Sequence, residues 1–158
     1  MILAEKRMQY QKKWFMDHEK DGKTEQIRNN TLNYFIHITQ GGSTKTRMWS
    51  TYQEYKDCMG AKGYKNGYVP LGSGDFADSP QKNHLCYLAN NFYPCSGRGN
   101  FEISEDDYAL MELLRFMFRS SLANGNEIWI YIPSKRMRDL LKNWIETKHS
   151  VYLSKTNH

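Results

Sequence analysis

The sequence predicts a single α/β domain, in which a mostly parallel sheet is flanked by helices. Short apolar runs alternate with segments of helical periodicity, and consecutive parallel strands need a crossover helix between them. The chain has 158 residues, a length that fits one domain with one core. Its hydrophobic fraction of 39% and aromatic fraction of 14% supply enough apolar surface for such a core.

The N-terminal third predicts helices and leaves one element open. Residues 2–20 contain no Gly or Pro and fit a short amphipathic helix that stops at Gly22. Residues 31–39 are aromatic and β-branched, which favours a strand, but the spacing of their apolar side chains also fits a helix. Residues 46–59 predict a helix that ends near Gly60.

The middle of the chain predicts two short strands. Residues 68–71 (Y-V-P-L) and residues 84–92 are apolar runs of the kind found in the interior of a sheet. Residues 72–82 lie between them and are rich in Gly, Ser and Asp, which is typical of a loop.

The last third predicts a helix, a strand and a second helix. Ser104 and Asp107 resemble a capping box, and the apolar helix that follows should continue to Asn124-Gly125 and be largely buried. Residues 127–132 (E-I-W-I-Y-I) predict a strand. The final helix begins at Pro133-Ser134. Its apolar side chains recur at helical spacing and should dock on the sheet: Met137, Leu140, Leu141, Trp144 and Ile145.

These elements divide the chain into three parts. Residues 1–30 form an N-terminal helical extension, residues 31–149 form the α/β domain, and residues 150–158 form a tail. No stretch approaches the roughly 20 apolar residues of a membrane span. The three cysteines lack the spacing of a disulfide framework, so we expect a soluble protein of the reducing cytoplasm.

Basic residues indicate an anionic partner. The net charge of +5 favours such a partner, and nucleic acid is the commonest one. Lys135, Arg138 and Lys142 fall on one face of the final helix, at a spacing suited to following a phosphate backbone. Arg136 lies beside them. A solvated helix face would show the same pattern.

Arg115 and Arg119 form a second candidate site on the preceding helix. They are four residues apart, so their guanidinium groups emerge on one side of an otherwise apolar helix. Such a pair either anchors loop carbonyls and carboxylates or binds a phosphate or carboxylate of a ligand.

No complete catalytic or metal-binding motif is present. Residues 41–46 (G-G-S-T-K-T) resemble part of a phosphate-binding loop, but the Gly that must precede Lys45 is missing, and a plain turn explains them equally well. His84, Cys86 and Cys95 include no C-x-x-C pair and have no fourth zinc ligand at a useful spacing. The residues therefore predict no catalytic site, no metal and no cofactor.

Five segments carry a resemblance to a known family: M-W-S-T-Y-Q-E-Y-K (48–56), K-G-Y-K-N-G-Y-V-P-L (62–71), L-C-Y-L-A-N (85–90), L-R-F-M-F-R-S-S-L (114–122) and I-Y-I-P-S-K-R-M-R-D-L-L-K-N-W-I (130–145). With these segments, residues 30–146 resemble the C-terminal, second RecA-like lobe of DEAD/DEAH-type helicases encoded by phages and mobile elements of low-GC Gram-positive bacteria. The resemblance implies the RecA-like lobe fold and a bacterial host cell.

The sequence departs from that family where the family couples ATP to nucleic acid. An N-A-R-A-T-N-like run is expected after the Y-V-P-L segment, but residues 72–77 read G-S-G-D-F-A. The family's arginine-finger motif resembles Q-W-I-W-R-S-A-I-R. This sequence keeps the central arginine of that motif as Arg119. Arg115 stands at the position of the Gln, and Ala123 stands at the position of the last Arg. The first lobe, with its Walker A motif, is absent. The resemblance thus implies the fold and a binding surface but argues against ATP hydrolysis.

We therefore expect a protein that is not an enzyme and that binds nucleic acid or a host nucleoprotein complex. The residues expected to bind are Lys135, Arg136, Arg138, Lys142, Arg115 and Arg119. Two alternatives remain open. One is a phage or mobile-element antagonist that binds and inhibits a host defence nuclease, as anti-CRISPR proteins do. The other is an ATP-dependent enzyme that a partner subunit completes.

Overall fold

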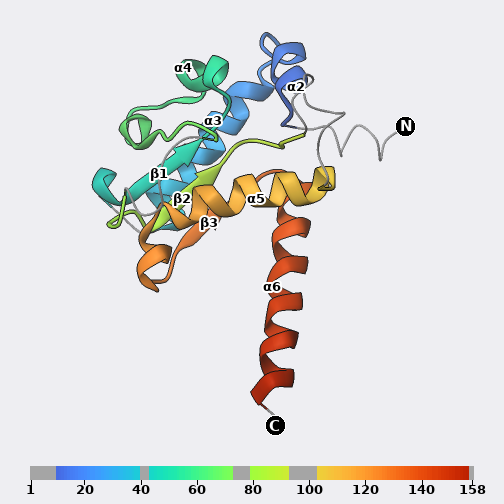
Figure 1. The fold of residues 1–158 in the computed structure, drawn as a ribbon. Helices are drawn as coiled ribbons and strands as arrows, with labels where there is room; N and C mark the ends of the chain where they lie inside the picture. Colours follow the sequence, from blue (N-terminus) through green and yellow to red (C-terminus); the bar gives the residue numbers. More distant parts are fainter. Residues whose placement is uncertain (1–9, 40–42, 73–78, 93–102, 157–158) are drawn as a thin grey trace.

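A computed structural model describes residues 10–39, 43–72, 79–92 and 103–156 of the chain (Figure 1). The helices and strands in this part of the chain are α2 (Lys12–Asp17), α3 (Lys23–Asn33), β1 (Arg47–Ser50), α4 (Lys56–Met59), β2 (His84–Tyr87), α5 (Glu105–Phe118), β3 (Trp129–Tyr131) and α6 (Lys135–Thr156).

The strands form a parallel sheet in the order β1-β2-β3. Met48 lies opposite Leu85, and Leu85 lies opposite Ile130. On the other edge of β1, Trp49 and Tyr68 form a single parallel bridge. The sheet and its flanking helices confirm the predicted fold class, a single α/β domain with a parallel sheet.

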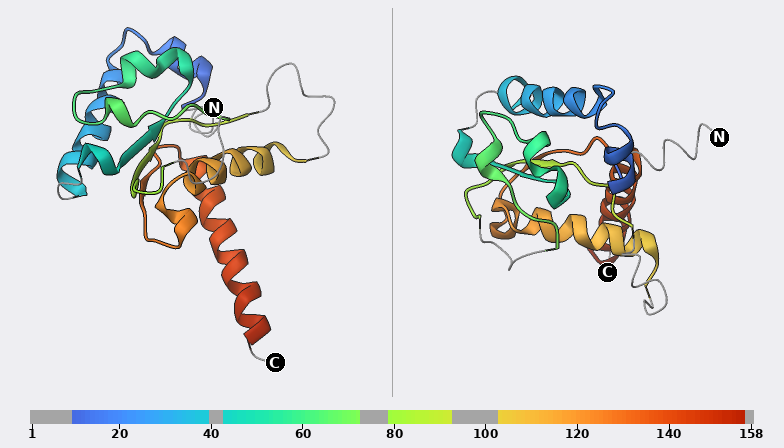
Figure 2. Two further views of the ribbon diagram at one scale, coloured as in Figure 1. Left: turned by 60° about the vertical axis from the view of Figure 1, so that its left-hand side comes forward. Right: turned by 90° about the horizontal axis from the view of Figure 1, so that it is seen from above.

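Alternate residues of the strands face two separate cores. Met48, Leu85 and Tyr87 belong to a first core together with α5 and the start of α6. Trp49, Cys86 and Leu88 belong to a second core that α2, α3 and α4 cover. This alternation follows from the two-residue period of a strand, which gives each face of the sheet its own apolar set. Figure 2 shows α3 and α4 over one face and α5 over the other.

The connections after β1 and β2 leave the sheet in opposite directions. The chain leaves β1 on the side of the second core, where Met59 of α4 packs, and returns to the outer edge at Tyr68. It leaves β2 on the side of the first core, where Leu113 of α5 packs, and then reaches β3. The carboxyl ends of β1 and β2 therefore flank a topological switch point.

The predicted start of α5 is confirmed. Ser104 is the N-cap, and its hydroxyl oxygen accepts a hydrogen bond from the Asp107 amide at 3.1 Å. The helix ends earlier than predicted, at Phe118, and just beyond it the Ser120 hydroxyl donates to the Met117 carbonyl oxygen. A separate 3-10 turn follows and ends at Gly125, whose φ of +77° suits a glycine.

Two predictions for the middle of the chain are wrong. Residues 46–59 do not form one helix, because Arg47–Ser50 pair with β2 as a buried strand and only Lys56–Met59 are α-helical. Residues 68–71 do not form a strand beyond the one bridge at Tyr68. The run over residues 84–92 is a strand only in its first part, β2.

The N-terminal predictions hold in part. The described piece of the predicted helix over residues 2–20 is α2, and residues 1–9 lie outside the described chain. The segment left open at residues 31–39 is helical: α3 continues into a π-helical turn, Tyr34–Ile38. Helix α3 runs across the boundary predicted after residue 30, and Phe15 and Ile27 are buried in the second core.

Helix α6 begins in the first core and then leaves the body of the domain (Figure 1). Met137 and Leu141 of the predicted apolar stripe are buried against α5 and the sheet. Trp144 is half-buried, and Ile145 is 50% exposed. The stripe therefore docks the first turns of α6 on the domain.

Candidate functional site

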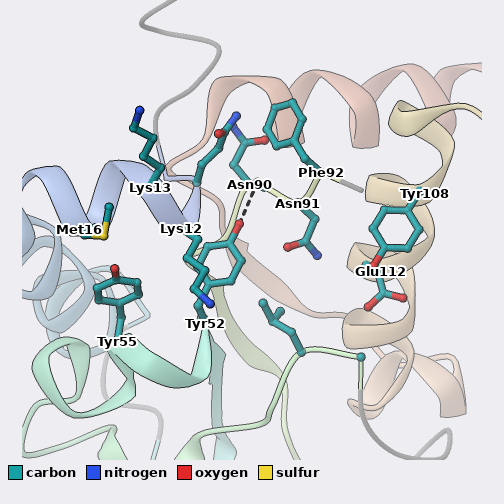
Figure 3. Close-up of a pocket in the computed structure, with 13 residues that line it drawn as sticks. Lys12, Lys13, Met16, Tyr52, Tyr55, Asn90, Asn91, Phe92, Tyr108 and Glu112 are labelled. Atoms are coloured by element: carbon teal, nitrogen blue, oxygen red, sulfur yellow. Dashed lines mark hydrogen bonds between the residues drawn. The ribbon is translucent and has the colours of Figure 1, made fainter. Parts of the chain in front are cut away.

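A crevice of about 730 Å³ opens at the carboxyl ends of β1 and β2 (Figure 3). In open α/β sheets, ligands bind outside the carboxyl ends of the strands at a topological switch point, which is where this crevice lies. Three groups of residues line it: Gln11, Lys12, Lys13 and Met16 from the N-terminal segment; Tyr52, Tyr55, Leu71, Gly72, Asn90, Asn91 and Phe92 from the loops; and Tyr108 and Glu112 from α5.

The floor of the crevice joins the loop after β1 to the loop after β2. The Tyr52 hydroxyl donates a hydrogen bond to the Asn90 carbonyl oxygen at 2.9 Å. Burial raises the pKa of the Tyr52 hydroxyl far above its usual value, so the group remains a donor at neutral pH. Asn91 donates through Nδ2 to the Tyr87 hydroxyl at 2.8 Å. The first bond joins the two loops at the switch point, and the second fastens the loop after β2 to its own strand.

Arg136 supports this floor from α6. Its Nη1 donates to Asn90 Oδ1 at 2.9 Å and to the Asn91 carbonyl oxygen at 2.7 Å. Its Nη2 lies 2.6 Å from Asp106 Oδ1, and its guanidinium carbon lies 4.2 Å from the centre of the Phe92 ring. The side chain is only 8% exposed. The structure thus places Arg136, predicted as a binding residue, under the crevice as a support.

Helix α2 forms one wall of the crevice. The Asn90 amide donates to the Tyr10 carbonyl oxygen at 3.0 Å, which fastens the N-terminal segment to the loop after β2. Lys12 forms an ion pair with Glu54, in the turn that follows β1. Lys13 is exposed and has no ion pair within the described residues. Helix α2 and its two lysines thus lie on the side of the crevice opposite α5 (Figure 3).

Glu112 on α5 forms the opposite wall. Its side chain is 7% exposed, and its Oε1 accepts a hydrogen bond from Arg115 Nη1 at 2.8 Å. Within the described parts of the chain, no donor bonds to Oε2. A Cβ atom built on Gly72 would lie 3.4 Å from this oxygen, and Gly72 has a φ of +67°. The glycine leaves the carboxylate accessible from the crevice.

A smaller cavity of about 70 Å³ adjoins the crevice and shares Leu71, Gly72 and Glu112 with it. Arg115 and Arg119 line this cavity, so the structure brings the second predicted pair next to the crevice. Arg119 is 8% exposed, whereas about half of the Arg115 side chain is exposed.

The remaining predicted residues lie along α6. Lys135 and Arg138 are exposed, as is Lys142 one turn further along. Lys135 forms an ion pair with Asp139. Arg138 Nη1 donates to the carbonyl oxygens of Ile132 and Pro133, both at 2.7 Å, and so holds the chain between β3 and α6.

The weaker motifs gain no support as ligand sites. A phosphate-binding loop leads into an α-helix, but Thr44–Thr46 form one 3-10 turn that leads into β1. Gly41 and Gly42 lie outside the described residues, as does Cys95. Cys86 is fully buried and lies 3.8 Å from the Thr31 hydroxyl. Among the described residues, no three His, Cys, Asp or Glu side chains are grouped in a way that could hold a metal ion.

Sequence reasoning missed most of the crevice. Lys13, Tyr52, Asn91 and Glu112 are far apart in the sequence and match no motif. One signal was available: Glu112 is an acidic residue in the middle of an apolar helix, three positions before Arg115, and buried carboxylates in such surroundings need a partner.

The parallel sheet, its two helical layers and the crevice at its carboxyl edge define a Rossmann-like α/β domain. The chain belongs to the family described as the YonV C-terminal Rossmann-like domain, whose sequence model matches residues 2–145. It is 32% identical over 142 residues to the SPbeta prophage-derived uncharacterized protein YonV of Bacillus subtilis (strain 168). The family therefore includes a protein of prophage origin.

The match covers 87% of this chain and 34% of that relative, so the chain spans about a third of the relative's length. No solved structure matches the chain. Among the described residues, no helix combines the length and the apolar character needed to cross a membrane.

Proposed function

We propose that this domain binds nucleic acid without catalysing a reaction on it, and that it derives from the second lobe of a phage helicase. The observation that carries the proposal is the composition of the crevice. Lysines stand on one wall, and aromatic rings and amides line the floor, so phosphate and base would each meet a suitable group.

The charges around this edge of the sheet support the proposal. Helix α6 follows directly after the carboxyl end of β3, so its basic residues begin at the same edge as the crevice. Lys135, Arg138 and Lys142 then continue along the exposed side of α6. A strand held in the crevice could extend along this helix, with its phosphates close to the basic side chains.

Binding to fluorescently labelled single- and double-stranded DNA and RNA, measured by anisotropy at several salt concentrations, tests the proposal. The logarithm of affinity should fall with the logarithm of salt concentration, with a slope of about −0.7 to −0.9 per phosphate contacted. Replacing Lys135, Arg138 and Lys142 together by Gln should flatten this slope by about 2 to 3 and weaken binding to unrelated sequences alike.

Single substitutions separate the crevice from general surface charge. Lys13→Gln should weaken binding, because Lys13 lines the crevice. Lys20→Gln is the matched control, because Lys20 is exposed outside the crevice and should leave affinity unchanged. If no labelled strand binds in a salt-dependent way at low ionic strength, the nucleic-acid proposal is wrong.

The prophage origin of the relative favours a second function, an antagonist that binds a host defence nuclease. An affinity pull-down from host cells, with and without nuclease treatment, separates the two functions. Recovery that nuclease abolishes supports nucleic-acid binding. A stoichiometric host protein that is recovered after nuclease treatment, and that the domain inhibits when purified, supports the antagonist.

A further inference from the structure

We propose that the crevice takes up one unpaired guanine base of a single strand and that Glu112 recognises the base edge. This inference rests on the proposed nucleic-acid binding and names the ligand of the same site. Nothing in the proposed function explains the carboxylate of Glu112 in this crevice. A buried acid is an unexpected group in a site for a polyanion.

Glu112 offers a hydrogen-bond acceptor to a ligand. The side chain is more than nine-tenths buried, and Arg115 satisfies Oε1. Oε2 has no donor within the described residues, and Glu112 lines the crevice, where its carboxylate can meet a donor from a ligand. An ionised carboxylate only accepts hydrogen bonds, and leaving it unpaired in a partly buried site is unfavourable. The ligand should therefore carry N–H donors.

The opposite wall excludes the simplest donors. A lysine or arginine side chain of a partner protein would suit Glu112, but it would enter a crevice that has Lys13 on its other wall. A phosphate ion would suit Lys13, but Glu112 would repel it. The ligand must be anionic at one end and carry N–H donors at the other. A nucleotide has this distribution, with its phosphate on the α2 side and its base on the α5 side.

The crevice has an aromatic side chain and a volume that suit a base. Tyr108 precedes Glu112 by four residues, so the two side chains project from the same face of α5 (Figure 3). A base that bonds to Glu112 would lie against the Tyr108 ring, and bases stack readily on aromatic side chains. The volume of about 730 Å³ lies within the range of small-molecule sites, about 300 to 1,000 Å³.

Guanine fits the carboxylate better than the other bases. Its N1–H and its exocyclic N2 amino group lie side by side, so it offers adjacent donors to an acceptor-only group. Adenine and cytosine place an acceptor nitrogen beside their amino group, and the ring N–H of uracil or thymine lies between two carbonyl oxygens. In a duplex, the guanine donors are already paired, so the crevice should select single strands.

Labelled thymidine strands of about 12 nucleotides, within the range of known single-strand sites, test this inference. Each strand carries one central guanine, inosine, adenine or thymine. Inosine lacks only the N2 amino group of guanine. The guanine strand should bind about tenfold more tightly than the inosine and adenine strands. Glu112→Gln should remove this preference.

Two controls make the outcome decisive. Glu127→Gln changes an exposed acid outside the crevice and should keep the guanine preference. The comparison of guanine with inosine uses the wild-type chain, so it stands even if Glu112→Gln fails to fold. If all four strands bind wild type equally in a salt-dependent way, or if Glu112→Gln keeps the preference, this inference is wrong and the proposed function stands. If no strand binds, both are wrong.

Discussion

Replacing Arg136 by Ala should destabilise the domain, although the sequence places this residue on a basic helix face. The change removes the guanidinium that donates to Asn90 Oδ1 and to the Asn91 carbonyl oxygen, and it leaves both acceptors without this donor. It also removes the ion pair with Asp106 and the contact over the Phe92 ring.

The size of the effect follows from the burial of these groups. Leaving a buried polar group without its hydrogen-bond partner costs about 1 to 3 kcal/mol. The ion pair adds little, at most about 1 kcal/mol, because the Asp106 side chain is 50% exposed. With two acceptors affected, Arg136→Ala should therefore lower the free energy of unfolding by about 2 to 7 kcal/mol. For a domain of this size, the melting temperature should fall by about 5 to 20 °C.

Urea unfolding followed by far-UV circular dichroism measures this change, with the slope of the transition as a check that the unfolded state is unaltered. Arg136→Lys should fall between wild type and Arg136→Ala, because one ammonium group cannot reproduce the planar fork of guanidinium donors. Lys142→Ala is the control on the same helix and should change stability by less than about 0.5 kcal/mol. If Arg136→Ala is as stable as this control, Arg136 does not support the crevice.

Two further predictions concern the core and the pH dependence of stability. Leu113 is fully buried, so Leu113→Ala should lower the free energy of unfolding by about 2 to 5 kcal/mol. Leu114 is half-buried, so Leu114→Ala should lower the free energy of unfolding by less. The reverse order in urea unfolding would contradict the assignment of the first core. Burial, with a smaller contribution from the positive charge of Arg47, lowers the pKa of His84. The unfolded chain therefore binds this proton more readily, and stability should fall as the pH drops below about 6.5. Melting curves at neutral and acidic pH should show that the stability of His84→Asn depends less on pH than that of wild type. If both proteins lose the same stability at acidic pH, groups other than His84 cause the loss.

The elements predicted correctly are those that local sequence defines. The start of α5 follows from a Ser N-cap and acidic residues in the first turn. The strand around residues 129–131 follows from alternating β-branched and aromatic residues next to Pro133. In both cases, the information lies within about ten residues of the element.

The prediction for residues 46–59 failed because the pattern of the side chains is ambiguous. Met48, Tyr52, Tyr55 and Met59 recur at spacings of four and three residues, which is typical of a helix. In the structure, Met48 belongs to a strand that is buried on both faces, and its partner is Leu85, far along the chain. Only this non-local parallel pairing selects a strand over a helix.

The candidate site could be predicted only as a place in the fold. Its residues come from α2, two loops and α5, and none of these segments contains a binding motif. A correct prediction of the strands would have been enough to locate the site, because parallel strands put their carboxyl ends on one edge of the sheet. The missed strand at Arg47–Ser50 therefore also concealed the switch point.

Several arginines of this chain bond to the backbone, whereas some of its lysines are exposed and form no ion pair among the described residues, so the predicted basic face contains two kinds of residue. Three arginines donate to backbone carbonyl oxygens at 2.7 Å. Arg47 bonds to Gly63, Arg136 bonds to Asn91, and Arg138 bonds to both Ile132 and Pro133. A guanidinium suits this use, because it is planar and has several fixed donors. The flexible ammonium groups of Lys13 and Lys142 have no ion pair within the described residues and are exposed. Loss of the buried Arg47 or Arg136 should therefore first appear as a loss of stability, whereas the exposed Lys13 and Lys142 should contribute to salt-dependent binding.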